Sequence, residues 1–145
     1  MISKYIKQGN IIIFESTVYP GVTEGICVPI IEEISSLTLN TDFFCAYSPE
    51  RISPGDKKFT LNNVVKITSG STTDIAKEVD QLYQKVVSAG TYKAPSIKIA
   101  EAAKIIENTQ RDVNIALMNE LAMMFDKMNI NYSEVLKAAK TKWNF

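Results

Sequence analysis

The stretch DFFCAYSPER, residues 42–51, indicates the class of fold, because a short apolar run ends abruptly in a polar turn. Runs that are apolar throughout are typical of strands buried on both faces of a parallel sheet. Two similar runs, NIIIF at residues 10–14 and NVVKIT at residues 63–68, lie on either side of it, and Tyr92 suggests a short fourth strand. Because helical patterns separate the runs, we predict an α/β fold with its sheet covered on both faces.

Helices are predicted over residues 2–7 (only a helix end), 23–36, about 71–87 and 131–140. Residues 71–74, STTD, resemble a capping box at the start of the third of these helices. The apolar side of the second is expected to comprise Ile26, Ile30, Ile31 and Ile34.

A longer helix is predicted from Ser96 onward, because more than 30 residues follow without glycine or proline. Its polar side carries Lys104, Asn108 and Arg111, which fall together at helical spacing. Beyond Asn114 the helix is apolar nearly all round, so we expect a second subunit or further parts of a longer chain to cover it. Its apolar stripe is expected to comprise Ile106, Val113, Leu117, Met124 and Met128.

Composition excludes several classes of function. Sixteen basic and sixteen acidic residues balance, so no net charge recruits nucleic acid or a membrane surface. No apolar run approaches the roughly 20 residues of a membrane span. Histidine is absent, which excludes a Ser-His-Asp triad and a histidine metal site, and no metal site is expected. Cys27 and Cys45 lie in apolar surroundings and far from a C-x-x-C spacing, which favours a reducing compartment such as the cytoplasm.

Polar residues follow the first two predicted strands. Ligands bind beyond the carboxyl ends of parallel strands, and these ends carry residues 15–21, 48–51 and 69–71. We expect the three loops to open on the same edge of the sheet. Each signal has an ordinary alternative: Glu50 and Arg51 can be an exposed pair, residues 16–17 a turn, and the polar side of the long helix a solvated face.

Four motifs in order carry a resemblance to a known family. They are ESTVYPGVTE at residues 15–24, YSPERISPGDKK at 47–58, AEAAKIIENTQRD at 100–112 and NIALMNEL at 114–121. Together they resemble the middle of a nucleotide-sugar 6-dehydrogenase, most of all the bacterial UDP-N-acetylhexosamine dehydrogenases of capsule and O-antigen synthesis. Phe59 departs from the pattern, since a histidine is expected after the two lysines.

This resemblance implies a chemistry in which the C6 alcohol of a UDP-sugar is oxidised to a carboxylate in two NAD-linked steps. It implies that Lys104 and Asn108 stabilise the developing oxyanion, with Lys104 also assisting alcohol deprotonation. Glu50 is the acid/base that activates water against a cysteine-bound thioester, and Thr17 orients water or contacts the nicotinamide side. The resemblance implies that the cofactor is lined by Ser16, Thr17 and Val18. It implies that the UDP-sugar contacts Lys104, Asn108 and the loop residues Glu50, Arg51, Ile52, Ser53 and Pro54.

Other expectations concern what surrounds the site. Arg51 meets either a phosphate or a structural carboxylate. Pro49 restricts the backbone beside Glu50, which is expected to fix the orientation of the carboxylate.

The family's glycine-rich turn and its Gly-His-Cys segment are both absent from this sequence. We therefore interpret residues 1–95 as the C-terminal half of a Rossmann-like NAD domain, and residues 96–145 as a long central helix and the start of an α-helical dimerisation region. The expected partners are a UDP-sugar and a second subunit, in a homodimer formed through the long helix. The chain by itself is expected not to oxidise sugar. The alternative is a non-catalytic helical module for dimerisation or binding.

Overall fold

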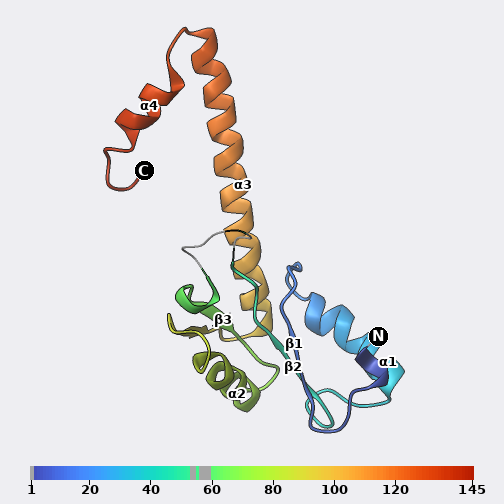
Figure 1. Ribbon diagram of the computed structural model, residues 1–145. Coiled ribbons are helices and arrows are strands. Elements are labelled where there is room, and N and C mark those ends of the chain that lie inside the picture. Colours follow the sequence, from blue (N-terminus) through green and yellow to red (C-terminus); the bar gives the residue numbers. More distant parts are fainter. Residues whose placement is uncertain (1, 53–54, 56–59) are drawn as a thin grey trace. The chain divides into compact units, whose positions relative to one another are not determined.

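The computed structural model describes residues 2–52, 55 and 60–145 (Figure 1). The chain forms two compact units, here called the first unit (residues 1–106) and the second unit (residues 107–145). Two residues predicted to contact substrate, Ser53 and Pro54, lie outside the described residues.

Four short strands form two parallel pairs in the first unit. Strand β1 (Ile11–Phe14) pairs with β2 (Phe44–Tyr47), with Ile11 opposite Phe44 and Phe14 opposite Tyr47. Strand β3 (Lys66–Thr68) pairs with β4 (Thr91–Lys93). The four predicted strands are confirmed, and the strands within each pair are parallel as predicted, although β1, β2 and β3 are shorter than their apolar runs.

The two strand pairs lie side by side, with the β3–β4 pair running in the opposite direction to the β1–β2 pair. The Ser48 hydroxyl donates to the Ile67 carbonyl at 2.7 Å, and the Ser69 hydroxyl donates to the Tyr47 carbonyl at 2.7 Å. The backbone N–H of Ser71 donates to the Cys45 carbonyl at 2.7 Å. As the chain advances from residue 67 to 71, its partners step back from 48 to 45, so β3 runs antiparallel to β2.

This direction overturns the prediction that the three loops open on one edge. Residues 69–71 lie beside the middle of β2, whereas the start of β3 lies beside its carboxyl end. A parallel crossover needs a dozen or more residues and usually a helix. The described part of the connection between β2 and β3 contains only the 3-10 helix η3 (Leu61–Asn63).

Helices cover both faces of these strands (Figure 1). Besides η3, the described helices of the first unit are η1 (Ile2–Lys4), the π-helix η2 (Thr23–Cys27), α1 (Val28–Ser35), α2 (Thr73–Gln84) and the beginning of α3 (Ile97–Lys127). On one face Ile12 and Tyr47 join side chains of α1 and α3 in the main core cluster. On the other face Ala46 packs with Ile75 and Val79 of α2. The predicted two-sided burial is confirmed.

Two helix predictions need correction. Helix α1 enters the core through Val28 and Ile31, whereas Ile26, Ile30 and Ile34 are 43, 43 and 39% exposed. The reason is rotational, because residues 28 and 31 lie one turn apart on a different side of the helix. The N-cap of α2 is Thr72, whose hydroxyl accepts the N–H of Ile75. Residue 71 is a sheet contact instead, since its hydroxyl accepts the Cys45 N–H at 3.2 Å.

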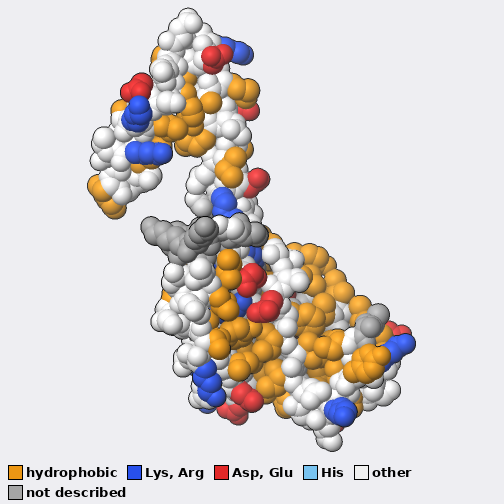
Figure 2. Space-filling model, in the orientation of Figure 1, with side chains coloured by type: hydrophobic (Ala, Val, Ile, Leu, Met, Phe, Trp, Pro, Cys, Tyr) orange, Lys and Arg blue, Asp and Glu red, His pale blue; other side chains and the backbone are white. Residues whose placement is uncertain are grey.

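The second unit contains the rest of α3 and helix α4 (Tyr132–Ala139). The side chain of Asn131 caps α4 by accepting the N–H groups of Ser133 and Glu134, as predicted. Phe125 and Tyr132 bring their rings to 6.4 Å between centroids. Figure 2 shows hydrophobic side chains at the surface of both units. Among the described residues, no helix is long and apolar enough to cross a membrane.

Candidate functional site

The carboxylate of Glu50 lies where β2 ends, directly after the fully buried Pro49. One oxygen, Oε1, accepts the backbone N–H groups of Arg51 at 2.6 Å and Ile52 at 2.7 Å. The other, Oε2, lies 3.5 Å from Nζ of Lys66. Burial raises the pKa of Glu50, but the two N–H donors and the ammonium outweigh it, so the pKa lies below its ordinary value. The carboxylate is ionised near neutral pH.

Lys104 reaches the same strand end from helix α3. Its Nζ donates to the backbone carbonyl oxygen of Glu50 at 2.5 Å. The structure therefore brings these two predicted residues together, although the lysine bonds to the backbone of Glu50. This contact leaves the carboxylate to its other partners.

The loop after β1 carries the residues predicted to contact cofactor. Ser16 and Thr17 are exposed, and Val18 packs against the main core cluster. The hydroxyl of Tyr47 donates to the carbonyl of Ser16 at 3.2 Å. Parallel pairing continues beyond the strands, because the N–H of Glu50 donates to the Glu15 carbonyl at 3.2 Å. The loop thus begins next to the strand end that carries Glu50.

The far end of this loop is held by a residue that the sequence analysis did not single out. The carboxylate of Glu101 is fully buried and accepts the N–H groups of Gly21 at 2.5 Å and Thr23 at 3.0 Å. Glu101 precedes Lys104 by three residues on α3. One helical turn therefore contacts both the start of η2 and the end of β2. Spacing could have revealed this role, because Glu101 shares a side of α3 with the buried Ile97.

Lys66 is the second missed residue. Its side chain is only 3% exposed, and its Nζ lies 3.1 Å from Oε1 of Glu15 as well as 3.5 Å from Oε2 of Glu50. The hydroxyl of Tyr83 donates to the same Glu15 oxygen at 2.7 Å, and the Tyr83 ring lies 5.2 Å from the ammonium. A lysine inside the apolar run at residues 63–68 was the available signal, since a buried ammonium requires partners.

Two of the remaining predicted site residues, Arg51 and Ile52, lie in the first unit, and Asn108 lies in the second unit. Arg51 donates from Nη1 to the Val65 carbonyl at 2.6 Å, and Ile52 contributes its N–H to the Glu50 carboxylate. Asn108 follows Lys104 by one turn of α3 but belongs to the second unit.

Neither cysteine is poised as a nucleophile. Cys45 is fully buried, and burial followed by the charges around it raises its pKa to about 12. Burial and the nearby Glu101 charge also raise the pKa of Cys27. A reactive cysteine needs a lowered pKa, so both thiols remain protonated at neutral pH. The described residues contain no cluster of three histidine, cysteine or acidic side chains that could hold a metal.

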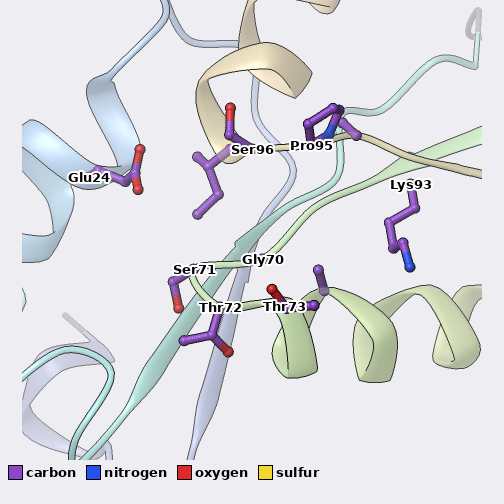
Figure 3. Close-up of a pocket in the computed structure, with 11 residues that line it drawn as sticks. Glu24, Gly70, Ser71, Thr72, Thr73, Lys93, Pro95 and Ser96 are labelled. Carbon is purple, nitrogen blue, oxygen red and sulfur yellow. The ribbon is translucent and has the colours of Figure 1, made fainter.

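A separate cavity of about 400 Å³ lies at the amino-terminal ends of α2 and α3 (Figure 3). Its lining includes Gly70, Thr73, Lys93 and Ser96, and none of the predicted site residues. It adjoins the carboxyl end of β3, whereas Glu50 lies beside the start of that strand. The cavity is therefore distinct from the cluster around Glu50.

The chain consists of an α/β segment followed by a helical segment. The α/β segment has parallel strand pairs with polar loops beyond β1 and β2, and the helical segment begins with a long helix. Residues 1–87 match the NAD binding domain of the UDP-glucose/GDP-mannose dehydrogenase family, and residues 98–145 match the central domain of that family. The chain belongs to the UDP-glucose/GDP-mannose dehydrogenase family.

Several relatives match nearly the whole chain. UDP-N-acetyl-D-glucosamine 6-dehydrogenase of Pseudomonas aeruginosa is 61% identical over 99% of this chain and 34% of its own length. Protein CapL of Staphylococcus aureus is 58% identical over 99% of this chain and 34% of its own. The structure of UDP-D-ManNAc dehydrogenase from Pyrococcus horikoshii aligns with a TM-score of 0.90 and 32% identity, covering 99% of this chain and 34% of that one. The chain thus spans about a third of the length of these relatives.

Proposed function

We propose that this chain is part of an NAD-dependent dehydrogenase that oxidises the C6 alcohol of a UDP-N-acetylhexosamine to a uronate for surface polysaccharide synthesis. The contact between Lys104 and Glu50 carries the proposal, because it joins an ammonium and a carboxylate-bearing turn at one strand end. Relatives named for UDP-N-acetylhexosamine oxidation match the chain at up to 61% identity.

The proposed roles follow from charge and rigidity. The ammonium of Lys104 assists deprotonation of the substrate alcohol and stabilises the negative oxygen that develops there, as does the amide of Asn108 one turn along α3. Both side chains are mounted on a helix, which holds a site more rigidly than a loop does. Substrate also contacts Arg51, Ile52, Ser53 and Pro54 in this proposal.

Glu50 acts as the base that activates water. Its carboxylate is held ionised by backbone N–H groups and Lys66, and it is 47% exposed, so water can reach it. A base must be unprotonated and within reach of the water that it activates.

NAD supplies the hydride acceptor when bound, and Ser16, Thr17 and Val18 are the residues proposed to line it, with Thr17 also orienting water. These residues suit NAD binding because of their position. Their exposed, hydroxyl-bearing loop lies beyond the carboxyl end of β1, where α/β sheets bind ligands. Tyr47 and Glu101 hold the loop near its two ends, so its backbone is already ordered.

The test measures NADH formation by the longer protein that contains this chain, with UDP-N-acetylhexosamines and with UDP-glucose. Lys104→Met is expected to lower kcat about 100-fold, the order of effect seen when one oxyanion donor is removed. The matched control is Lys77→Met, an exposed lysine on α2, which leaves kcat unchanged. Equal rates for Lys104→Met and wild type would overturn the proposal.

The 145-residue chain alone is expected to produce no NADH, because its two thiols are protonated at neutral pH and it lacks the glycine-rich turn. Turnover by the isolated chain would contradict this expectation.

A second candidate function is a non-catalytic helical module that forms a homodimer. The apolar side chains Val113, Leu117 and Met124 favour it, since all three are exposed on α3. Light scattering with and without UDP-sugar separates the candidates. The helical module is supported if the chain forms a dimer whose size does not change with UDP-sugar, and if the longer protein has no dehydrogenase activity.

A further inference from the structure

We propose that Lys66, itself held by Glu15 and Tyr83, is a positioning residue that fixes the carboxylate of Glu50 at the carboxyl end of β2. The inference rests on the proposed function, in which Glu50 acts as a base. It is argued from the hydrogen bonds and the ion pair of the Glu50 carboxylate. Oε1 of Glu50 is occupied by the N–H groups of Arg51 and Ile52, so Lys66 is the cation at Oε2.

Burial makes the lysine the fixed partner. Its side chain is 3% exposed, whereas those of Glu15 and Glu50 are 49 and 47% exposed. Moving a buried ammonium away from its counter-charges is costly, while a half-exposed carboxylate can rotate into solvent. With Oε1 held by two backbone N–H groups, the position of Lys66 therefore determines where Oε2 of the Glu50 carboxylate rests.

The direction of β3 places this ammonium. Lys66 begins β3, and β3 runs antiparallel to β2, so its first residue lies beside the carboxyl ends of β1 and β2. A parallel β3 would put this lysine at the other edge of the sheet, away from Glu15 and Glu50. The reversal thus brings a cation from one strand pair to the carboxylates of the other.

Among the described residues, charged and titratable groups lie around Glu50 on several elements. Lys66 comes from β3, Glu15 from the loop after β1, and Tyr83 from α2, while Lys104 of α3 bonds to its backbone and Arg51 follows it in the chain. Glu15 competes for the ammonium through its 3.1 Å contact. Removing Lys66 and removing Glu15 must therefore shift the pKa of Glu50 in opposite directions.

The first experiment follows the carboxyl-carbon NMR signal of Glu50 against pH in the 145-residue chain, assigned with Glu50→Gln. Lys66→Met is expected to raise the pKa of Glu50 by about one unit, because an adjacent opposite charge is lost. Lys66→Arg keeps the wild-type pKa, and Glu15→Gln lowers it. The matched control Lys77→Met, at an exposed ion pair on α2, leaves it unchanged.

Two results overturn the inference: a Glu50 pKa that does not move in Lys66→Met, or one that rises in Glu15→Gln. If Lys66→Met fails to fold, Glu15→Gln still decides, because it alters only a half-exposed side chain.

The second experiment separates this inference from the proposed function. In the longer protein, the acidic limb of the pH dependence of kcat is expected to move upward by about one unit in Lys66→Met and to return in Lys66→Arg. An active enzyme whose acidic limb is unchanged in Lys66→Met overturns the role of Lys66. A longer protein that binds but never oxidises UDP-sugar overturns the proposed function, while the NMR shifts still establish that Lys66 positions Glu50.

Discussion

The first unit has a buried core, whereas in the second unit, residues 107–145, no residue is buried. Residues such as Phe43 and Tyr47 are inaccessible to solvent, but Val113 and Leu117 of the second unit are 57 and 49% exposed. Both units are rich in apolar side chains, so composition does not explain the difference. Two layers around a pair of strands can bury apolar side chains from both sides, and two helices alone cannot. The two helices of the second unit therefore leave its apolar side chains uncovered.

The largest effect should come from Phe43→Ala. Phe43 is fully buried in the main core cluster, so its truncation should lower the free energy of unfolding by about 3–5 kcal/mol. The matched change in the second unit, Leu117→Ala, should cost less than about 1 kcal/mol, because half of that side chain already meets water. Urea unfolding followed by circular dichroism measures both. Equal costs would mean that the second unit has a core of its own.

Glu101→Ala should have a smaller effect within the first unit. It leaves the N–H groups of Gly21 and Thr23 without their acceptor, at a cost of about 2 kcal/mol. Glu120→Ala, at an exposed carboxylate of the second unit, is the control and should change little. Amide exchange at Gly21 and Thr23 should accelerate in the first variant alone. Unchanged protection of those amides would show that Glu101 does not hold the loop.

The smallest effect should follow loss of a helix cap. Asn131→Ala removes the acceptor for two N–H groups of α4, worth about 1 kcal/mol. Since α4 has no buried residue, only α4 should open, and amide exchange should rise there alone. Thr72→Ala removes the matching cap of α2, which packs in the core, so the same cost should destabilise the whole first unit. If amide exchange rose only within the affected helix in both variants, the two units would not differ in how their helices are stabilised.

Much of the fold could be predicted from the order of apolar runs. The four strands and the long helix lie where the sequence indicates, because short β-branched runs and a stretch without glycine or proline are local signals. Of the predicted apolar side of the helix at residues 23–36, Ile31 is buried as predicted, but Ile26, Ile30 and Ile34 are exposed. Its isoleucines recur at one helical spacing, but which side is buried depends on what packs against it.

The candidate site divides in the same way. Lys104 and Glu50 were singled out by motif, and the structure brings them into contact. Lys66 and Glu101 were missed, because the partners that explain them are distant in sequence: Glu15 lies 51 residues from Lys66, and Gly21 lies 80 from Glu101. The chemical roles assigned to Lys104, Glu50, Thr17 and Asn108 stay predictions.

The sequence by itself determined the elements, their order and the chemical character of each strand end, since these depend on neighbours along the chain. Only the tertiary structure decided that β3 runs antiparallel to β2, and with it that the buried Lys66 lies beside Glu50. Strand direction depends on how a connecting segment returns and on contacts between remote residues. No local pattern of side chains records those contacts.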